Sequence, residues 1–116
     1  MPESTTAKGR AGEDLAALAL TRAGYSIIAR NTRTEGGEID VVAYDGEVLC
    51  FIEVRRRVRS LAAIESVDAR KKARLTRAAE AFLQALEGAP PRCRFDVVIV
   101  ADGRASVIKN AFEAAS

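Results

Sequence analysis

The sequence predicts an α/β fold: a mixed four-stranded sheet with helices on both faces and a short extra strand at the C-terminal end. Two segments repeat apolar residues at helical spacing, and shorter segments alternate or run apolar as strands do. The second helix follows the third strand, so it forms the crossover that makes the third and fourth strands parallel. With 116 residues the chain can bury one core. We therefore expect residues 1–116 to form a single domain, with residues 1–7 flexible.

The first helix is predicted over 8–23, with Gly24 as its C-terminal stop. Apolar residues cover most of its circumference, so we expect it to pack on two sides. The two apolar stripes are Leu15, Leu18 and Ala19, and Ala16, Ala17, Leu20 and Ala23.

A strand at 25–31 and a turn at 32–37 come next, followed by two strands joined at Asp45-Gly46, a strong hairpin signal. After an irregular link, a long amphipathic helix ends before Gly88. Its core-facing stripe is predicted to be Leu75, Ala79, Phe82 and Leu86. These later segments are strands 38–44 and 48–54, the link 58–66, the helix 67–87, strand 94–100 and a last strand near 105–108.

Composition excludes several kinds of chemistry. The chain has no histidine, so Ser-His-Asp and Cys-His catalysis and the usual histidine-containing zinc sites are ruled out. Cys50 and Cys93 lack metal-ligand spacing and are interpreted as reduced packing residues. No apolar run is long enough for a membrane span, and the N-terminus does not resemble a signal peptide. We expect a cytoplasmic protein with no membrane partner and no small-molecule cofactor.

Positive charge is concentrated in one segment, although the net charge of the chain is only +2. Nine basic residues and two acidic ones lie between positions 55 and 77, a net charge of about +7. Such a cluster indicates a phosphate-backbone binder, and a solvated arginine-rich face is the alternative. The candidate nucleic-acid contacts outside the site itself are Arg56, Arg57, Arg59, Arg70, Lys72, Arg74 and Arg77.

Carboxylates interrupt the central hairpin. If Tyr44 and Glu47 flank the turn, Glu38 faces Glu53 directly and Asp40 is a diagonal neighbour of Glu53. These three acids then project from one face together with Arg55. Buried like charges need compensation, which arginine pairing or a divalent ion such as Mg²⁺ or Mn²⁺ could supply. The spacing leaves both options open.

The order of motifs resembles a known family over nearly the whole chain. "GRAGEDLA", "GYSIIARN", "GGEIDVVA", "FIEVRRR", "VDARKKARL", "RFDVV" and "VIKNAF" are similar to the YraN family of uncharacterised bacterial proteins. That family is related in fold to archaeal Holliday junction resolvases. Its restriction-endonuclease-like αβββαβ core belongs to the PD-(D/E)xK nuclease superfamily.

The resemblance implies a catalytic site. Asp40 and Glu53 would be metal ligands together with the backbone carbonyl of Val54. Glu38 would not bind the metal itself but would lie next to these ligands. Glu13 would be a further acid of the site and an additional candidate ligand, although a first-turn carboxylate favoured by the helix dipole is the alternative.

The superfamily's E-x-K motif reads "EVR" here, so Arg55 stands where a catalytic lysine is expected. Arginine essentially never loses its proton and places its charge differently. Lys71, on the edge of the core stripe of the second helix, is a candidate replacement, or it simply extends to water.

Two functional hypotheses follow. The first is a Mg²⁺- or Mn²⁺-dependent DNA endonuclease, acting on branched or single-stranded DNA, whose site is weakened by Arg55. The second is a catalytically inactive nucleic-acid-binding or protein-interaction module on the same fold. DNA is the expected partner in preference to RNA, and a homodimer is left as an option.

Overall fold

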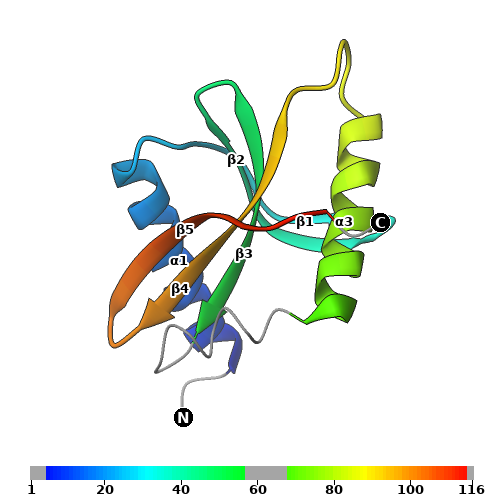
Figure 1. The fold of residues 1–116 in the computed structure, drawn as a ribbon. Coiled ribbons are helices and arrows are strands. Elements are labelled where there is room, and N and C mark those ends of the chain that lie inside the picture. The colour runs from blue at the N-terminus through cyan, green and yellow to red at the C-terminus, as the bar shows by residue number, and fades with distance from the viewer. Residues whose placement is uncertain (1–4, 57–67, 115–116) are drawn as a thin grey trace.

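The computed structural model describes residues 5–56 and 68–114, with side chains from residue 11 onward. Figure 1 shows two helices on opposite sides of one sheet. The elements are α1 (Thr5–Arg22), β1 (Ser26–Thr34), β2 (Gly37–Asp45), β3 (Val48–Arg56), α3 (Ala69–Gln84), β4 (Cys93–Ala101) and β5 (Arg104–Phe112). Among the described helices, none is long and apolar enough to cross a membrane.

The predicted mixed sheet is confirmed, but it has five strands in the order β1-β2-β3-β4-β5. Strands β1 to β3 pair antiparallel, β3 and β4 pair parallel, and β4 and β5 pair antiparallel. The expected short C-terminal strand is a full strand of nine residues. Asp102 and Gly103 both have positive φ, as a two-residue type I′ turn requires, so pairing starts at once on either side of the turn.

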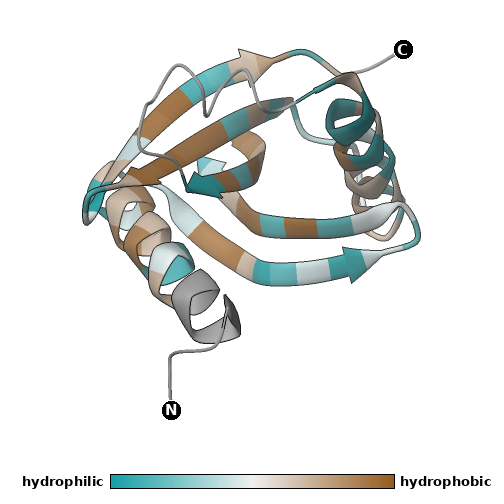
Figure 2. Ribbon diagram, turned by 90° about the horizontal axis from the view of Figure 1, so that it is seen from below, coloured by the Kyte–Doolittle hydropathy of each residue, from teal (hydrophilic) through white to brown (hydrophobic). Residues whose placement is uncertain are grey.

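Two apolar clusters hold the helices on the two faces of the sheet. Leu75, Ala78 and Ala79 of α3 pack with Phe51, Phe95 and other sheet residues, and Phe82 and Leu86 extend this cluster. Ala16 and Leu20 of α1 pack on the other face against residues such as Ile52 and Val98. Figure 2 shows the apolar segments of the strands lying between the two helices. The core stripe predicted for α3 is therefore confirmed.

Local signals determine where the helices end. Gly24 has φ of 95°, and the Tyr25 N–H donates to the Leu20 carbonyl at 3.0 Å, a Schellman end for α1. Asp68 caps α3, because its side chain accepts the Lys71 N–H at 3.0 Å. Helix α3 therefore begins at Ala69, two residues later than predicted.

Strand β1 is longer than predicted. It runs to Thr34, so the expected turn at 32–37 shrinks to two residues, with Thr34 paired to Gly37.

The predicted register of the central hairpin is wrong by two residues. Asp45 pairs with Val48 and Tyr44 with Leu49, so Gly46 and Glu47 form the turn. Gly46 has φ of 62° and occupies the first central position, where a type II′ turn requires glycine. Because the shift is an even number of residues, the shift by itself moves no side chain to the other face of the sheet. The pairing partners across the strands nevertheless change.

Strand β4 is buried on both faces, as its sequence indicates, yet it contains the fully buried Asp96. Its carboxylate accepts hydrogen bonds from Tyr25 Oη at 2.6 Å, Arg94 Nε at 2.8 Å and the Asn110 N–H at 2.8 Å. Burial alone would raise the pKa of Asp96, but the hydrogen bonds from Arg94 and Tyr25 hold it below its ordinary value. Asp96 thereby satisfies the backbone of β5 where the β4–β5 register shifts and Asn110 takes a positive φ.

The β1–β2 turn fastens the sheet to α3. Thr34 Oγ1 donates to the Ala78 carbonyl at 3.0 Å. A Cβ added to Gly36 would overlap the Ala78 nitrogen and lie 2.6 Å from the Arg77 carbonyl oxygen, so only glycine fits against the helix backbone. The turn therefore fixes the distance between β2 and α3.

Gly36→Ala should lower the free energy of unfolding by about 1–3 kcal/mol or more, because rigid backbone must shift to admit the methyl group. Chemical denaturation should show the loss, and Glu35→Ala, at the neighbouring exposed turn position, should change stability by less than about 0.5 kcal/mol. Equal stability of Gly36→Ala and wild type would contradict the tight packing of this turn on α3.

Candidate active site

The site lies where two strands separate. Pairing between β2 and β3 ends at Val41 and Ile52, and beyond that point β2 pairs with β1 while β3 pairs with β4. Asp40 is the next residue of β2, and its Oδ2 accepts the Val54 N–H at 2.8 Å. Continuing the register places Asp40 directly across from Glu53, not diagonally as predicted. The two carboxylates therefore face each other at the opening.

A polar pocket of about 400 Å³ surrounds this opening. Acids from β2 and β3 form its floor, and the β1–β2 hairpin and α3 form its walls. Gly37 allows the walls to approach, since a Cβ there would lie 3.1 Å from Arg74 Cγ. The lining residues are Arg33, Gly37, Glu38, Asp40, Glu53, Lys71, Arg74 and Leu75.

The acids of the pocket lack full compensation within the described residues. Burial and the neighbouring Glu53 carboxylate raise the pKa of Asp40 to about 7. The hydrogen bond from the Val54 N–H lowers it, but by less. Burial also raises the pKa of Glu53, although Arg55, Lys71 and Arg74 oppose the shift. The unmet negative charge gives the site a preference for a proton or a cation.

Glu13 reaches the same site from α1. Its carboxylate is close enough to Asp40 to contribute to the raised pKa of that group. One oxygen, Oε2, is buried and has no hydrogen-bond partner among the described residues. An unpaired buried oxygen close to the Asp40 carboxylate is costly without a proton or a cation, and oxygen donors of this kind suit a hard metal ion.

The described side chains would give a metal ion only a small number of protein ligands. Within residues 5–56 and 68–114, no group of three or more acidic or cysteine side chains is arranged to hold one ion. Asp40 and Glu53 would therefore be the protein's carboxylate ligands, with the Val54 carbonyl as the predicted third donor. Mg²⁺ commonly binds through one or two carboxylates and keeps several waters, which suits this arrangement.

Arg55 lies beside the acids but does not line the pocket. Its Nη1 is 3.7 Å from Glu53 Oε1, and its side chain is 14% exposed. Arg56 follows on the other face, where its Cδ would lie 2.7 Å from a Cβ on Gly12 of α1. Both arginines are thus held by the protein's own residues.

The predicted helix residues divide into three groups. Lys71 and Arg74 line the pocket and lie close enough to Glu53 to lower its pKa. An outward row of Arg70, Arg74 and Arg77 is expected from helical spacing; Arg70 and Arg77 are exposed accordingly, whereas Arg74 borders the pocket. Lys72 Nζ instead sits 5.6 Å from the centre of the Phe112 ring. Arg57 and Arg59 lie outside the described residues.

Arg33 is a pocket residue that the sequence analysis missed. It pairs with Glu38 across β1 and β2, its Nη2 lies 3.5 Å from Glu38 Oε2, and its side chain is 83% exposed. The glycines at 36 and 37 predict a turn over the whole of 32–37, which would leave Arg33 outside the strand. The signal that could find it is the two-residue turn Glu35-Gly36, which brings Arg33 opposite Glu38.

The fold and pocket define a small α/β domain with a carboxylate site at the divergence of its central strands. The chain belongs to the uncharacterised protein family UPF0102, whose model matches residues 12–100. The resemblance to the YraN family is thereby confirmed. A UPF0102 protein of Symbiobacterium thermophilum is 50% identical over 113 residues, which cover 91% of this chain and 96% of that protein. One from Pseudomonas aeruginosa is 46% identical over 121 residues, with 97% of each chain covered.

Asp40 should make the metal-free protein less stable as the pH rises. Its pKa is 3.8 in a model peptide and about 7 in the fold, so between these values the folded state binds more protons than the unfolded state. Stability therefore falls from about pH 4 to pH 7 and then levels off. In EDTA, Asp40→Asn should exceed wild type at pH 8 by on the order of 2 kcal/mol and match it near pH 4, as measured by chemical denaturation.

Mn²⁺ should reverse this order. It should raise the melting temperature of wild type at pH 8 and leave that of Asp40→Asn unchanged, because the variant has lost one carboxylate ligand. Asp102→Asn, in the exposed β4–β5 turn, should respond to pH and Mn²⁺ as wild type does. A calorimetric Mn²⁺ titration that gave equal binding to wild type and Asp40→Asn would remove Asp40 from the ligand set.

Proposed function

We propose that the protein is a nuclease-like, nucleic-acid-binding protein whose pocket supports slow, divalent-metal-dependent hydrolysis of DNA phosphodiesters. The observation that carries the proposal is the pair Asp40 and Glu53 at the strand divergence, with three cationic side chains around the same pocket. Carboxylates that favour a metal cation lie beside lysine and arginine side chains that favour phosphate. This is the combination that phosphoryl chemistry needs.

The chain's own residues have separable roles in this proposal. Mg²⁺ or Mn²⁺, when bound, supplies Lewis-acid activation of the phosphate and of the attacking water. Lys71 and Arg74, which stand over Glu53 from α3, would bind the phosphate oxygens and offset their developing charge. Arg33 would hold the nucleic-acid backbone at the outer edge, since its side chain is largely exposed.

Arg55 supports a reduced rate. Its guanidinium pairs with Glu53 and neutralises part of the acid charge that would attract a metal. Lysine at this position would have a compact ammonium on a flexible stem, free to approach the phosphate. Lys71 compensates in part because α3 carries it to the same pocket. The inactive binding module remains the second candidate, and the Arg55–Glu53 pair is the observation that favours it.

Restoring lysine should increase cleavage. Arg55→Lys should raise Mn²⁺-dependent hydrolysis of labelled DNA by about 10-fold or more, which corresponds to about 1.4 kcal/mol of recovered transition-state stabilisation. Lys71→Ala should reduce cleavage by about 100-fold if α3 supplies the working lysine. The assay should compare linear duplex, single-stranded and four-way-junction DNA in Mg²⁺, Mn²⁺ and EDTA.

Two controls make the assay decisive. Lys109→Ala, at a lysine that pairs with Asp45, should cleave as wild type does. Asp40→Asn should be inactive, which excludes a contaminating nuclease. If wild type and Arg55→Lys both leave every DNA form intact in both metals while DNA is still bound, the inactive binding module is the correct function.

DNA binding should be mainly electrostatic and should use α3 at two places, the exposed Arg70 and Arg74 at the pocket. Arg70→Ala with Arg74→Ala should flatten the dependence of log affinity on log salt by about one to two units, because two phosphate contacts are lost. Fluorescence anisotropy over a salt series measures the slope. Arg92→Ala, an exposed arginine before β4, is the control and should leave the slope unchanged. No retention of DNA by wild type at low salt would exclude nucleic-acid binding.

A further inference from the structure

The outer face of α1 is an apolar surface that the fold leaves uncovered within the described residues. The inner stripe of α1 is buried, with Ala16 and Leu20 fully inaccessible. The outer stripe is open, and Leu18 is 46% exposed. The sequence predicts packing on two sides of this helix, and the described chain supplies one of them.

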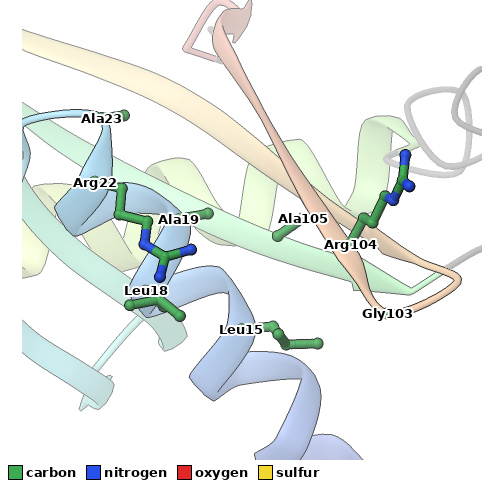
Figure 3. A pocket seen from close by; sticks show the side chains of 8 residues that line it. All are labelled: Leu15, Leu18, Ala19, Arg22, Ala23, Gly103, Arg104 and Ala105. Atoms are coloured by element: carbon green, nitrogen blue, oxygen red, sulfur yellow. The ribbon is translucent and has the colours of Figure 1, made fainter.

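A groove of about 580 Å³ runs along this face between α1 and the β4–β5 turn. Figure 3 shows the side chains of α1 on one side of it and those of the turn on the other. Its lining is mostly apolar, and Arg22 and Arg104 are its basic residues. The lining residues are Leu15, Leu18, Ala19, Arg22 and Ala23 of α1 with Gly103, Arg104 and Ala105. Single exposed leucines are ordinary, but a groove with an apolar floor is suited to a partner.

Charges on α1 are placed symmetrically about Leu18. Asp14 lies four residues before it and Arg22 four residues after it, and all three residues are exposed on the same helical face. Four residues of helix rise about 6 Å, so the two charges lie about 6 Å on either side of Leu18 along the axis. The face thus has an apolar centre, an acidic end and a basic end.

We propose that α1 is the contact surface of a homodimer, in which the α1 helices of two copies pack antiparallel about a two-fold axis at Leu18. In that arrangement the leucines meet at the centre, and Asp14 of each copy lies level with Arg22 of the other. One surface then supplies both halves of a self-complementary interface. This complementarity favours a second copy over an unrelated partner.

Both charged groups are available for the contact. Asp14 Oδ1 already accepts a hydrogen bond from Arg30 Nη2 at 2.7 Å, but the Asp14 side chain is 68% exposed, which leaves it accessible to a second arginine. Arg22 has no ion pair with the side chains that the structure describes, and its guanidinium lies at the groove (Figure 3). The dimer would therefore add an ion pair at each end without breaking an internal one.

The expected dimer is weak, because one helix face per copy is at the small end of specific interfaces. Sedimentation equilibrium from about 5 µM to about 500 µM should show a reversible monomer–dimer equilibrium in wild type. Leu18→Glu should weaken dimerisation at least about 10-fold, since it places two carboxylates at the centre. Ile28→Glu is the matched control, because Ile28 is the same size as leucine, is 48% exposed and lies on β1. This variant should dimerise like wild type.

A charge exchange tests the antiparallel register. Arg22→Asp should weaken dimerisation about 10-fold or more, because the symmetry duplicates each like-charge contact. Combining it with Asp14→Arg in an Arg30→Ala background, where Arg30 no longer faces the new arginine, should restore the wild-type dissociation constant to within about 3-fold, because both ion pairs are re-formed with reversed signs. Arg30→Ala, which removes only the internal partner of Asp14, should leave dimerisation unchanged.

Three results would overturn the proposal. They are a monomer at every concentration, equal weakening by Leu18→Glu and Ile28→Glu, and failure of the double exchange to restore what Arg22→Asp removes. Circular dichroism should accompany each variant; if Leu18→Glu does not fold, the exchange at exposed positions 14 and 22 decides alone. The test does not depend on nuclease activity, because it measures only molecular mass.

Discussion

The hydrogen bond from the Val54 N–H to the Asp40 carboxylate is the interaction on which the rest of the site depends. It stands where the β2–β3 ladder ends, and it satisfies a backbone donor of β3 that β2 no longer reaches. It also fixes Asp40 across from Glu53. Burial raises the pKa of both groups, and the Glu53 carboxylate adds to the rise at Asp40, so excess negative charge collects where the ladder opens.

The two acidic sites of the sheet illustrate how surroundings decide the role of a carboxylate. Asp96 is less exposed to solvent than Asp40, but four hydrogen bonds from Tyr25, Arg94 and Asn110 saturate it and its pKa stays low. Asp40 receives one backbone donor and has acids as neighbours. A saturated carboxylate stabilises the fold and has no capacity for a ligand. An under-satisfied one costs stability and keeps its capacity for a metal or a proton, which is typical of functional sites.

The position of α3 couples packing to the site. Gly36 and Thr34 hold the helix backbone against the β1–β2 turn, while Leu75 and Ala78 pack into the sheet. These contacts deliver Lys71 and Arg74 to the acids. The inner face of helix α1 packs on the sheet, and Glu13 of this helix approaches Asp40. The outer face of α1 stays open within the described residues. Each helix therefore supplies one packing face and a separate face for interaction.

The sequence by itself determined the fold class and the core stripe of α3, because these follow from periodicity along the chain. It also drew attention to Asp40 and Glu53, which line one pocket, since carboxylates in apolar strands conflict with local preference. It placed the hairpin turn two residues out of register, because Asp45-Gly46 and Gly46-Glu47 both satisfy turn chemistry and only pairing with the rest of the sheet selects one. Arg33 lines the pocket, Lys72 lies over Phe112 and Asp96 accepts from Tyr25 and Asn110 through contacts between residues far apart in the chain. Only the tertiary structure decided those positions, because the direction of a side chain's partner is set by packing and not by its neighbours in sequence.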